Sequence, residues 1–263
     1  MPISRASPDI DRGLTYAEAC FETFRVIRGE VFCWQAHMDR LAQGLDTFGM
    51  SLPEGLKGRC LHAARDVGPD VLLRLTVSGG PAAWGLKAPE QRQPDVYIQA
   101  MPYWPRQSPV SLHSVGWPFP LRQKAAKYTS DYAETLRALR LLEQSGLPAG
   151  DEALICDEHR IYSGITANVV IFREEQWWTP RLGGILPGVI RGWLLQAGVV
   201  READCPRTWL NDCKALALTN SGSFVQPIST IDGRKLVSDG AVFDDLWQVL
   251  NDKPGVLGRD VCS

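Results

Sequence analysis

Short runs of β-branched and aromatic residues, each bounded by turn residues, recur along this chain of 263 residues. In residues 20–34, CFETFRVIRGEVFCW, two such runs flank Arg28-Gly29, which predicts a β-hairpin. The other runs predict strands at residues 71–80, 95–104, 152–157, 160–164, 168–172, 176–180 and 214–222. The first hundred residues therefore predict a small α+β unit with mainly antiparallel pairing.

Three segments carry apolar residues at helical spacing. Residues 37–50 form the first predicted helix, and residues 130–146 the second, with Ser130 as its N-cap and Gly146 as its stop. A third helix is predicted to start near Pro187-Gly188, where GGILPG leads into an apolar face. That face consists of Val189, Ile190, Trp193, Leu194 and Ala197. Strands and helices together indicate an α+β or α/β fold.

Two proline-rich stretches without periodicity, MPYWPRQSPV and GWPFPLRQ, separate the two halves of the chain. They predict a connection between two domains. The expected division is a small N-terminal α+β domain over residues 1–105, an interdomain connection over 106–122, and a larger C-terminal domain over 123–263.

Composition argues against several classes of protein. The formal net charge is -2 and no basic cluster stands out, so nucleic acid is not an expected partner. No apolar run is long enough to span a bilayer, and MPISRASPDI lacks the apolar core of a signal peptide, so we expect a cytoplasmic protein without membrane contact. Seven scattered cysteines without a C-x-x-C pair predict buried thiols, and four histidines without ligand spacing predict no metal site.

The GGILPG loop is a candidate anion site, because the first N–H groups of a helix lack intrahelical partners. A second loop, TNSG at residues 219–222, ends a predicted strand with hydroxyl groups and free N–H groups. Two such loops and an arginine would satisfy a phosphate. The sequence contains no P-loop, no Rossmann fingerprint and no G-x-S-x-G elbow, so a nucleotide is not the expected ligand.

A phosphate site without a nucleotide motif suggests a phosphorylated cofactor such as pyridoxal 5′-phosphate (PLP), which needs a lysine. Lys124 and Lys127 lie in RQKAAKYTSDY, between the predicted connection and the second half of the chain. A domain junction is where a cofactor cleft would form. Either lysine is therefore a candidate.

These motifs, taken in order, resemble the fold type IV PLP enzymes, which include branched-chain aminotransferases, D-amino acid aminotransferases and 4-amino-4-deoxychorismate lyases. The similarity runs from about Asp11 to Lys235 through DRGLTY, CFETFRV, HMDRL, AKYTSDY, GDEALICD, ITANVVIF, WTP and GILPGVIR. It implies a two-domain fold with PLP bound by the larger C-terminal domain. It also implies a homodimer, with the active site in the domain cleft near the second subunit.

The resemblance implies roles for particular residues. Lys127 would form the Schiff base with PLP, with Lys124 as the alternative that fits the downstream spacing less well. Arg40, in HMDRL, would contact the phosphate. The other cofactor-binding residues it implies are Asn168, the backbone at Val189 and Ile190, and the loop residues Thr219, Asn220 and Ser221.

The sequence departs from the family at one position. Members usually carry a glutamate five residues before the asparagine of the NVVIF-like strand, and that acid keeps the pyridine nitrogen protonated. Here Asn168 is preceded at that spacing by Ser163, and Glu158 lies five residues further back. A serine can form a hydrogen bond with the ring but cannot hold a proton on it by charge. A 1,3-proton shift should suffer more from this change than a direct elimination.

The first hypothesis is a lyase that releases pyruvate and 4-aminobenzoate, a step of folate biosynthesis. It is favoured by the short chain and by Phe21, which stands where many aminotransferases carry a tyrosine. The second hypothesis is an aminotransferase that acts on a D- or branched-chain amino acid with a keto-acid acceptor. A third is a PLP-binding member with little catalysis. Candidate partners for a substrate carboxylate are Arg25, Arg106 and Arg122, although each is expected to be an exposed side chain.

Overall fold

The computed structural model describes residues 9–104, 106 and 110–251. The expectations that concern residues 1–8 and Cys262 lie outside this part of the chain. Within it, none of the helices is long and apolar enough to cross a membrane.

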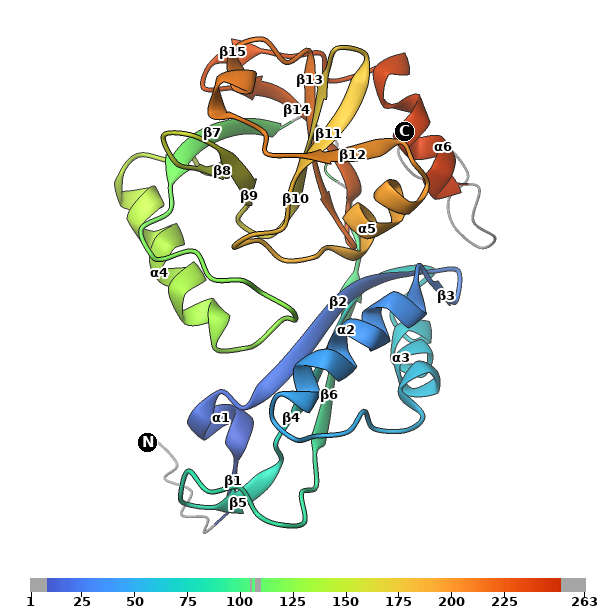
Figure 1. Cartoon of the computed structure of the whole chain (residues 1–263). Helices are drawn as coiled ribbons and strands as arrows, with labels where there is room; N and C mark the ends of the chain where they lie inside the picture. The colour runs from blue at the N-terminus through green and yellow to red at the C-terminus, as the bar shows by residue number, and fades with distance from the viewer. Residues whose placement is uncertain (1–8, 105, 107–109, 252–263) are drawn as a thin grey trace.

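A four-stranded antiparallel sheet forms the smaller part of the molecule, which we call the small lobe (Figure 1). Its strand order is β3-β2-β4-β6, with bounds Glu30–Val31, Ala19–Ile27, Asp70–Ser78 and Asp95–Pro102. Arg28 and Gly29 have φ values of 50° and 81° between β2 and β3, as a tight hairpin turn requires. The predicted hairpin is therefore confirmed, and so is the antiparallel pairing.

Two helices, α2 (Trp34–Asp46) and α3 (Leu56–Arg65), cover one face of this sheet. Alternate residues of β2, including Cys20, Phe24 and Val26, point into the core beneath these helices. The predicted helix at 37–50 corresponds to α2, which begins three residues earlier, whereas α3 was not predicted. A short helix, α1 (Arg12–Tyr16), and a two-stranded sheet of β1 (Asp9–Asp11) and β5 (Pro81–Ala83) lie at the far end of the lobe.

A nine-stranded mixed sheet forms the large lobe (Figure 1). The strand order is β12-β11-β10-β13-β14-β7-β8-β9, with β15 paired to β14. The bounds, in chain order from β7, are Val110–Gly116, Glu152–Cys156, Ile161–Gly164, Asn168–Arg173, Gln176–Pro180, Val200–Ala203, Ala215–Asn220, Phe224–Ile231 and Arg234–Lys235. The sheet curls, so that β9 comes close to β10. All the strands predicted in the second half are present.

One expectation for the domain division differs from the structure. The expected connection at 106–122 contains β7, which pairs in parallel with both β8 and β14 inside the large sheet. The prolines that flank this strand hid its VSLHSVG pattern. The large sheet therefore begins at Val110.

Three helices accompany the large sheet: α4 (Asp131–Gln144), α5 (Val189–Gln196) and α6 (Asp244–Asn251). Helix α4 lies to one side of the gap between the lobes, and α5 faces the small lobe (Figure 1). Ser130 is the N-cap of α4, as expected, and α5 starts after its N-cap Gly188, which agrees with the predicted start near Pro187-Gly188. Among the described residues, neither cap makes a side-chain hydrogen bond to its helix.

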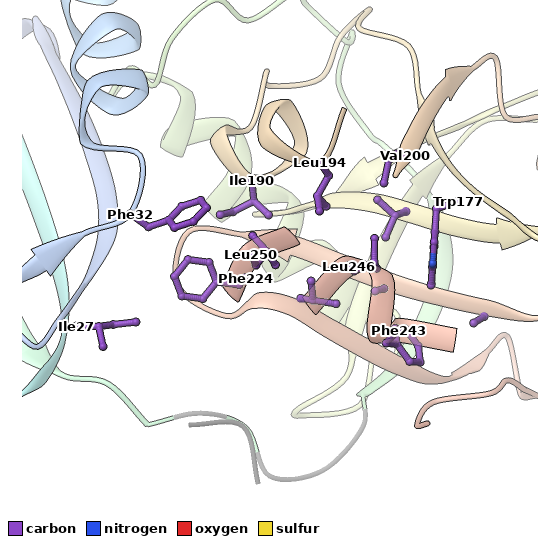
Figure 2. Packing of buried hydrophobic residues seen from close by; sticks show 14 residues of the cluster. Ile27, Phe32, Trp177, Ile190, Leu194, Val200, Phe224, Phe243, Leu246 and Leu250 are labelled. Atoms are coloured by element: carbon purple, nitrogen blue, oxygen red, sulfur yellow. The ribbon is translucent and has the colours of Figure 1, made fainter. Parts of the chain in front are cut away.

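A shared apolar cluster joins the two lobes. Figure 2 shows Phe32, which follows β3, beside Ile190 of α5 and Phe224 of β14. The rings of Phe32 and Phe224 meet edge to face with centroids 5.4 Å apart. Because this contact is buried, the mutual position of the lobes depends on it. The interpretation as core thiols is confirmed for five cysteines: Cys20, Cys60, Cys156, Cys205 and Cys213. Cys33, in contrast, is only partly buried.

Candidate active site

A cavity of about 380 Å³ lies between the lobes, a size typical of small-molecule sites. Its walls come from β2, the segment before α4, strands β9 and β10, the start of α5 and the end of β13. Most of the predicted site residues line it: Phe21, Arg40, Lys127, Ser163, Asn168, Val189, Thr219, Asn220 and Ser221. Residues far apart in the chain thus meet where the sequence predicted a cleft.

Lys127 is fixed by backbone pairing to the first residues of β2. The Phe21 N–H donates to the Lys127 carbonyl oxygen at 3.0 Å, and the Thr129 N–H donates to Ala19 at 3.0 Å. The side chain is partly buried, and its Nζ lies 5.4 Å from the centre of the Phe21 ring. Burial lowers the pKa of Lys127 from 10.5 to about 8, with Glu22 opposing and Arg40 reinforcing the shift. A lysine with this pKa supplies a neutral, nucleophilic amine close to neutral pH.

Lys124 also lines the cavity, but in a different environment. Its side chain is 35% exposed, and its Nζ lies 3.7 Å from a carboxylate oxygen of Asp131. The Lys124 amine is therefore engaged in an ion pair with the first residue of α4. The local chemistry therefore favours Lys127 as the reactive amine.

A buried ionic cluster lies beside Lys127 and consists of Glu22 from β2 and His37 and Arg40 from α2. Arg40 donates from Nε and Nη2 to the two oxygens of Glu22, each at 2.7 Å, and His37 Nδ1 lies 2.7 Å from Glu22 Oε2. Burial alone would raise the pKa of Glu22, but the hydrogen bonds from Arg40 and His37 outweigh it and lower the pKa to about 2. The carboxylate is therefore ionised at any working pH.

Neither Glu22 nor His37 was predicted as a site residue. A signal existed, since the alternation of β2 points Glu22 into the core with Phe24, where an unpaired acid would be costly. His37 and Arg40 are three residues apart in α2 and so share a helix face. Only the packing of α2 on β2 reveals that the two signals belong together.

The GGILPG loop is held at the start of α5 by Asn168. The Asn168 amide donates from Nδ2 to the Leu186 carbonyl oxygen at 2.9 Å. A Cβ added at Gly188 would lie 2.0 Å from the Asn168 side-chain oxygen, so this close approach requires glycine. Arg40 also donates from Nη1 to the Pro187 carbonyl oxygen at 2.8 Å. The loop is thus fixed on two sides, and the first N–H groups of α5 lie at the cavity.

The end of β13, where the second loop begins, contains a buried hydroxyl without a partner among the described residues. Thr219 is 1% exposed, and its Oγ1 has no hydrogen bond within the described part of the chain. The Asn220 side-chain oxygen accepts hydrogen bonds from the N–H groups of Gly222 and Ser223, both at 2.9 Å. Asn220 therefore shapes the turn with its side chain, which leaves Thr219 and Ser221 to face the cavity.

These features fit the phosphate of PLP. Thr219, Val189 at the start of α5 and Arg40 all line the cavity, and a hydroxyl, a helix N-terminus and a guanidinium each favour an anion. The side chain of Ile190 does not line the cavity and packs in the shared apolar cluster. Its predicted role concerned the backbone alone, which belongs to the first turn of α5.

An aromatic stack forms another wall of the cavity. The rings of Phe21 and Tyr132 are nearly parallel, with centroids 5.0 Å apart, and the Arg74 guanidinium lies 3.8 Å from the centre of the Phe21 ring. Arg74 also donates to the Tyr132 hydroxyl at 3.1 Å. Ser163, from β9, lines the same cavity.

The three candidate arginines have different environments. Arg106 and Arg122 are exposed, as expected, and only Arg122 lines the cavity. Arg25, in contrast, is 2% exposed, so the expectation of an exposed side chain requires correction. It lies outside the cavity lining, and its role as a substrate ligand stays a prediction. It pairs with Asp70 and lies 3.9 Å from the Tyr103 ring centre. Its guanidinium also lies against Gly222 and Phe224 of the large lobe, which explains this burial.

The fold and the cavity agree with the comparisons to known proteins. Residues 19–231 match the model of the family described as "Amino-transferase class IV". The match covers most of the chain, and the chain therefore belongs to the class IV aminotransferase family. The members of this family are PLP-dependent, so this protein is a PLP-dependent enzyme with the two-domain fold type IV architecture.

Three relatives illustrate the range of activities. The "Putative branched-chain-amino-acid aminotransferase" of Methanocaldococcus jannaschii is 25% identical over 242 residues, which are 85% of this chain and 82% of that protein. The structure of a "Putative 4-amino-4-deoxychorismate lyase" from Legionella pneumophila has a TM-score of 0.77 at 26% identity, covering 95% of this chain and 96% of that one. A hypothetical aminotransferase from Mycobacterium tuberculosis in its PLP-bound form has a TM-score of 0.75 at 21% identity, covering 95% and 93%.

Proposed function

We propose that this enzyme is a 4-amino-4-deoxychorismate lyase that releases pyruvate and 4-aminobenzoate. The single observation that carries the proposal is Ser163, a neutral side chain in the cavity at the position where the family usually has an acid. The likeness to the Legionella pneumophila protein supports it, since that protein resembles this chain over 95% of its length.

Lys127 is the residue that holds PLP and moves protons in this proposal. Bound PLP supplies an electron sink next to the amine of the substrate. The Lys127 Nζ takes the proton from the amine-bearing carbon, as its lowered pKa allows near neutral pH. The bond between the substrate ring and the oxygen of its enolpyruvyl group then breaks, and the ring becomes aromatic. The expelled enolpyruvate takes up a proton at its CH2 carbon to become pyruvate, and Lys127 gives up the proton that it accepted. Arg40, Thr219 and the start of α5 bind the phosphate.

Ser163 makes elimination the favoured outcome. A hydroxyl in place of the acid would offer the pyridine nitrogen a hydrogen bond without a charge, and it would not hold a proton on that nitrogen. A weak electron sink disfavours the transfer of a proton to the cofactor that transamination needs. An elimination, which expels a leaving group from the substrate itself, depends less on a strong electron sink than transamination does.

The walls of the cavity suit a cyclic substrate. Four aromatic side chains line it, and they offer faces on which a six-membered ring can pack: Phe21, Trp117, Tyr128 and Tyr132. Phe21 carries no hydroxyl, so its contact with the substrate is apolar. Arg122 and Lys124 lie on the same lining and supply positive charge for substrate carboxylates.

The second candidate is an amino-acid aminotransferase, favoured by the 25% identity to the Methanocaldococcus jannaschii protein. In that reaction Lys127 would move a proton between the substrate carbon and the cofactor, and a keto acid would accept the amine. The residues that bind PLP would be the same. Only the fate of the substrate carbon differs between the two candidates.

The products separate the two candidates. The purified protein is supplied with PLP and either 4-amino-4-deoxychorismate or a panel of D- and branched-chain amino acids. Pyruvate released without any keto acid identifies the lyase, whereas amine transfer that strictly requires a keto acid identifies the aminotransferase. Saturation with PLP but no turnover of any substrate would favour a PLP-binding member without catalysis.

A homodimer is also part of the proposal. Three large apolar side chains at the far end of the small lobe are at least four-fifths exposed: Leu14, Trp84 and Leu86. Exposed apolar side chains in a group are typical of contact surfaces. Light scattering coupled to size-exclusion chromatography measures the mass, and a mass of one chain would contradict the dimer.

A further inference from the structure

The Glu22 carboxylate holds Arg40 in one orientation. The two parallel hydrogen bonds, from Nε to Oε1 and from Nη2 to Oε2, form the fork geometry that fixes a guanidinium plane. Nη1 donates to Pro187, so three of the donor atoms of Arg40 are committed within the protein. The guanidinium has five N–H bonds, which leaves N–H groups of Nη1 and Nη2 for a ligand. Arg40 is 7% exposed and lines the cavity, so a ligand reaches it from the cavity alone.

His37 completes the coordination of the carboxylate. Its Nδ1 lies 2.7 Å from Glu22 Oε2, and its Nε2 is buried without a hydrogen-bond partner in the described part of the chain. Burial lowers the pKa of His37 from 6.5, so the ring is neutral near pH 7 and donates from Nδ1. A neutral donor fixes the carboxylate without competing with Arg40 for its charge. The aromatic ring also contacts Phe24, at a centroid distance of 5.3 Å, which restricts its rotation.

We propose that Glu22 and His37 are positioning residues that orient Arg40 toward the phosphate of the cofactor, and thereby set the affinity for the phosphate rather than for the pyridine ring. The inference rests on the proposed function, because it takes Arg40 as a phosphate ligand. Neither residue reaches the ligand itself, since both are fully buried. Their effect is transmitted through the Arg40 guanidinium.

The test compares two ligands that differ only in the phosphate, PLP and pyridoxal. Their dissociation constants are measured by absorbance titration of the full-length protein after removal of bound cofactor. The variant Glu22→Gln keeps the shape of the side chain but removes its charge. Two variants replace His37: His37→Leu removes the donor to Glu22, whereas the amide of His37→Asn can still donate. Leu45→Ala serves as the matched control, because Leu45 is buried in α2 but lies outside the cluster.

Glu22→Gln should weaken PLP binding by roughly 10- to 100-fold, the size expected for charge-assisted hydrogen bonds, and leave pyridoxal binding nearly unchanged. His37→Leu should also weaken PLP binding selectively, but by a smaller factor. His37→Asn should retain most of the wild-type affinity for PLP. Leu45→Ala should leave the ratio of the two affinities as it is in the wild type.

Two results would overturn the inference. The first leaves the proposed phosphate site intact, and the second contradicts that site as well. If the wild type prefers PLP and the variants lower both affinities together, or neither, Glu22 and His37 have no role in orienting Arg40, while the phosphate site stands. If the wild type binds PLP no better than pyridoxal, Arg40 is not a phosphate ligand, and the inference falls together with the proposed cofactor site. Circular dichroism of each variant separates a loss of folding from a loss of affinity, and His37→Asn still gives a ratio if Glu22→Gln does not fold.

Discussion

The backbone N–H of Phe21 donates a hydrogen bond to the carbonyl oxygen of Lys127, across 3.0 Å. Phe21 belongs to β2 of the small lobe, and Lys127 to the segment that leads into α4. The bond therefore fixes the proposed Schiff-base lysine against a residue that is 106 positions earlier in the chain (127 − 21). The position of the Lys127 amine depends on both lobes at once.

Lys127→Ala should abolish covalent attachment of PLP and reduce turnover by roughly 100-fold or more, because the proton-transferring amine is lost. Lys124→Ala is the matched control for covalent attachment alone, since Lys124 lines the same cavity and is paired with Asp131. Borohydride reduction followed by peptide mass spectrometry locates the attached cofactor. Attachment that survives in Lys127→Ala and disappears in Lys124→Ala would reverse the assignment.

The rate at which the cofactor-free protein captures PLP should depend on pH through Lys127. The lysine attacks as a neutral amine, and its pKa is lowered from 10.5 to about 8. The rate constant should thus rise by about tenfold per pH unit below this pKa and level off above it. Stopped-flow absorbance between about pH 6 and about pH 10 measures this rate constant on both sides of the pKa. A rate that keeps rising like that of free Nα-acetyl-lysine would contradict the lowered pKa.

Ser163→Glu should restore a proton on the pyridine nitrogen of bound PLP. A carboxylate beside the ring would raise the pKa of that nitrogen by roughly 1–3 units, and amine transfer should increase relative to pyruvate release. The ¹⁵N chemical shift of ring-labelled PLP reports the proton directly. Ser163→Gln has nearly the same shape without the charge, so it should leave the shift at the wild-type value. Equal shifts in Glu and Gln variants would mean that Ser163 does not face the nitrogen.

Gly188→Ala should disturb the phosphate site. The added Cβ would lie 2.0 Å from the Asn168 side-chain oxygen, so the loop must move away from the position that Asn168 and Arg40 define. We expect a loss of stability of about 1–3 kcal/mol together with at least a tenfold weaker affinity for PLP. Thermal unfolding with and without PLP measures both effects.

Gly192→Ala provides the comparison in the same helix. A Cβ at Gly192 would meet no atom within 4 Å, and alanine is the better helix former, so the variant should gain about 0.5–1 kcal/mol and bind PLP as the wild type does. If both variants weakened PLP binding equally, the effect would arise from α5 in general rather than from the contact with Asn168.

Local pattern was sufficient to predict the elements that carry the site. The hairpin at Arg28-Gly29, the helix that begins beyond Gly188 and the strands from Glu152 to Pro180 are all present, because alternation, helical spacing and turn residues are encoded within a few positions. The order of the motifs was sufficient to identify the family. Strand β7 was not predicted, because the prolines that flank it are typical of a linker. Helix α3 was not predicted, because its apolar pattern is short and is interrupted by charged residues.

Arg25 and Glu22 show what local pattern leaves open. The two residues lie three positions apart in β2, so they point to opposite faces of the sheet. Glu22 meets α2 and its pair of basic side chains, whereas Arg25 meets Asp70 and the aromatic rings of Tyr103 and Phe224. The alternation predicts that their surroundings differ, but it does not say which partners each will find.

The sequence by itself determined the family, the fold class, the cofactor and the presence of a serine at position 163, because each of these is written in short motifs and their order. The tertiary structure alone decided that Lys127 is desolvated and that the Thr219 hydroxyl has no partner among the described residues. It also decided that Glu22 pairs with both Arg40 and His37. Burial and charge pairing depend on residues brought together from distant positions, such as Phe21 with Lys127. The energy of an ionisable group is set by these neighbours, and no local pattern contains them.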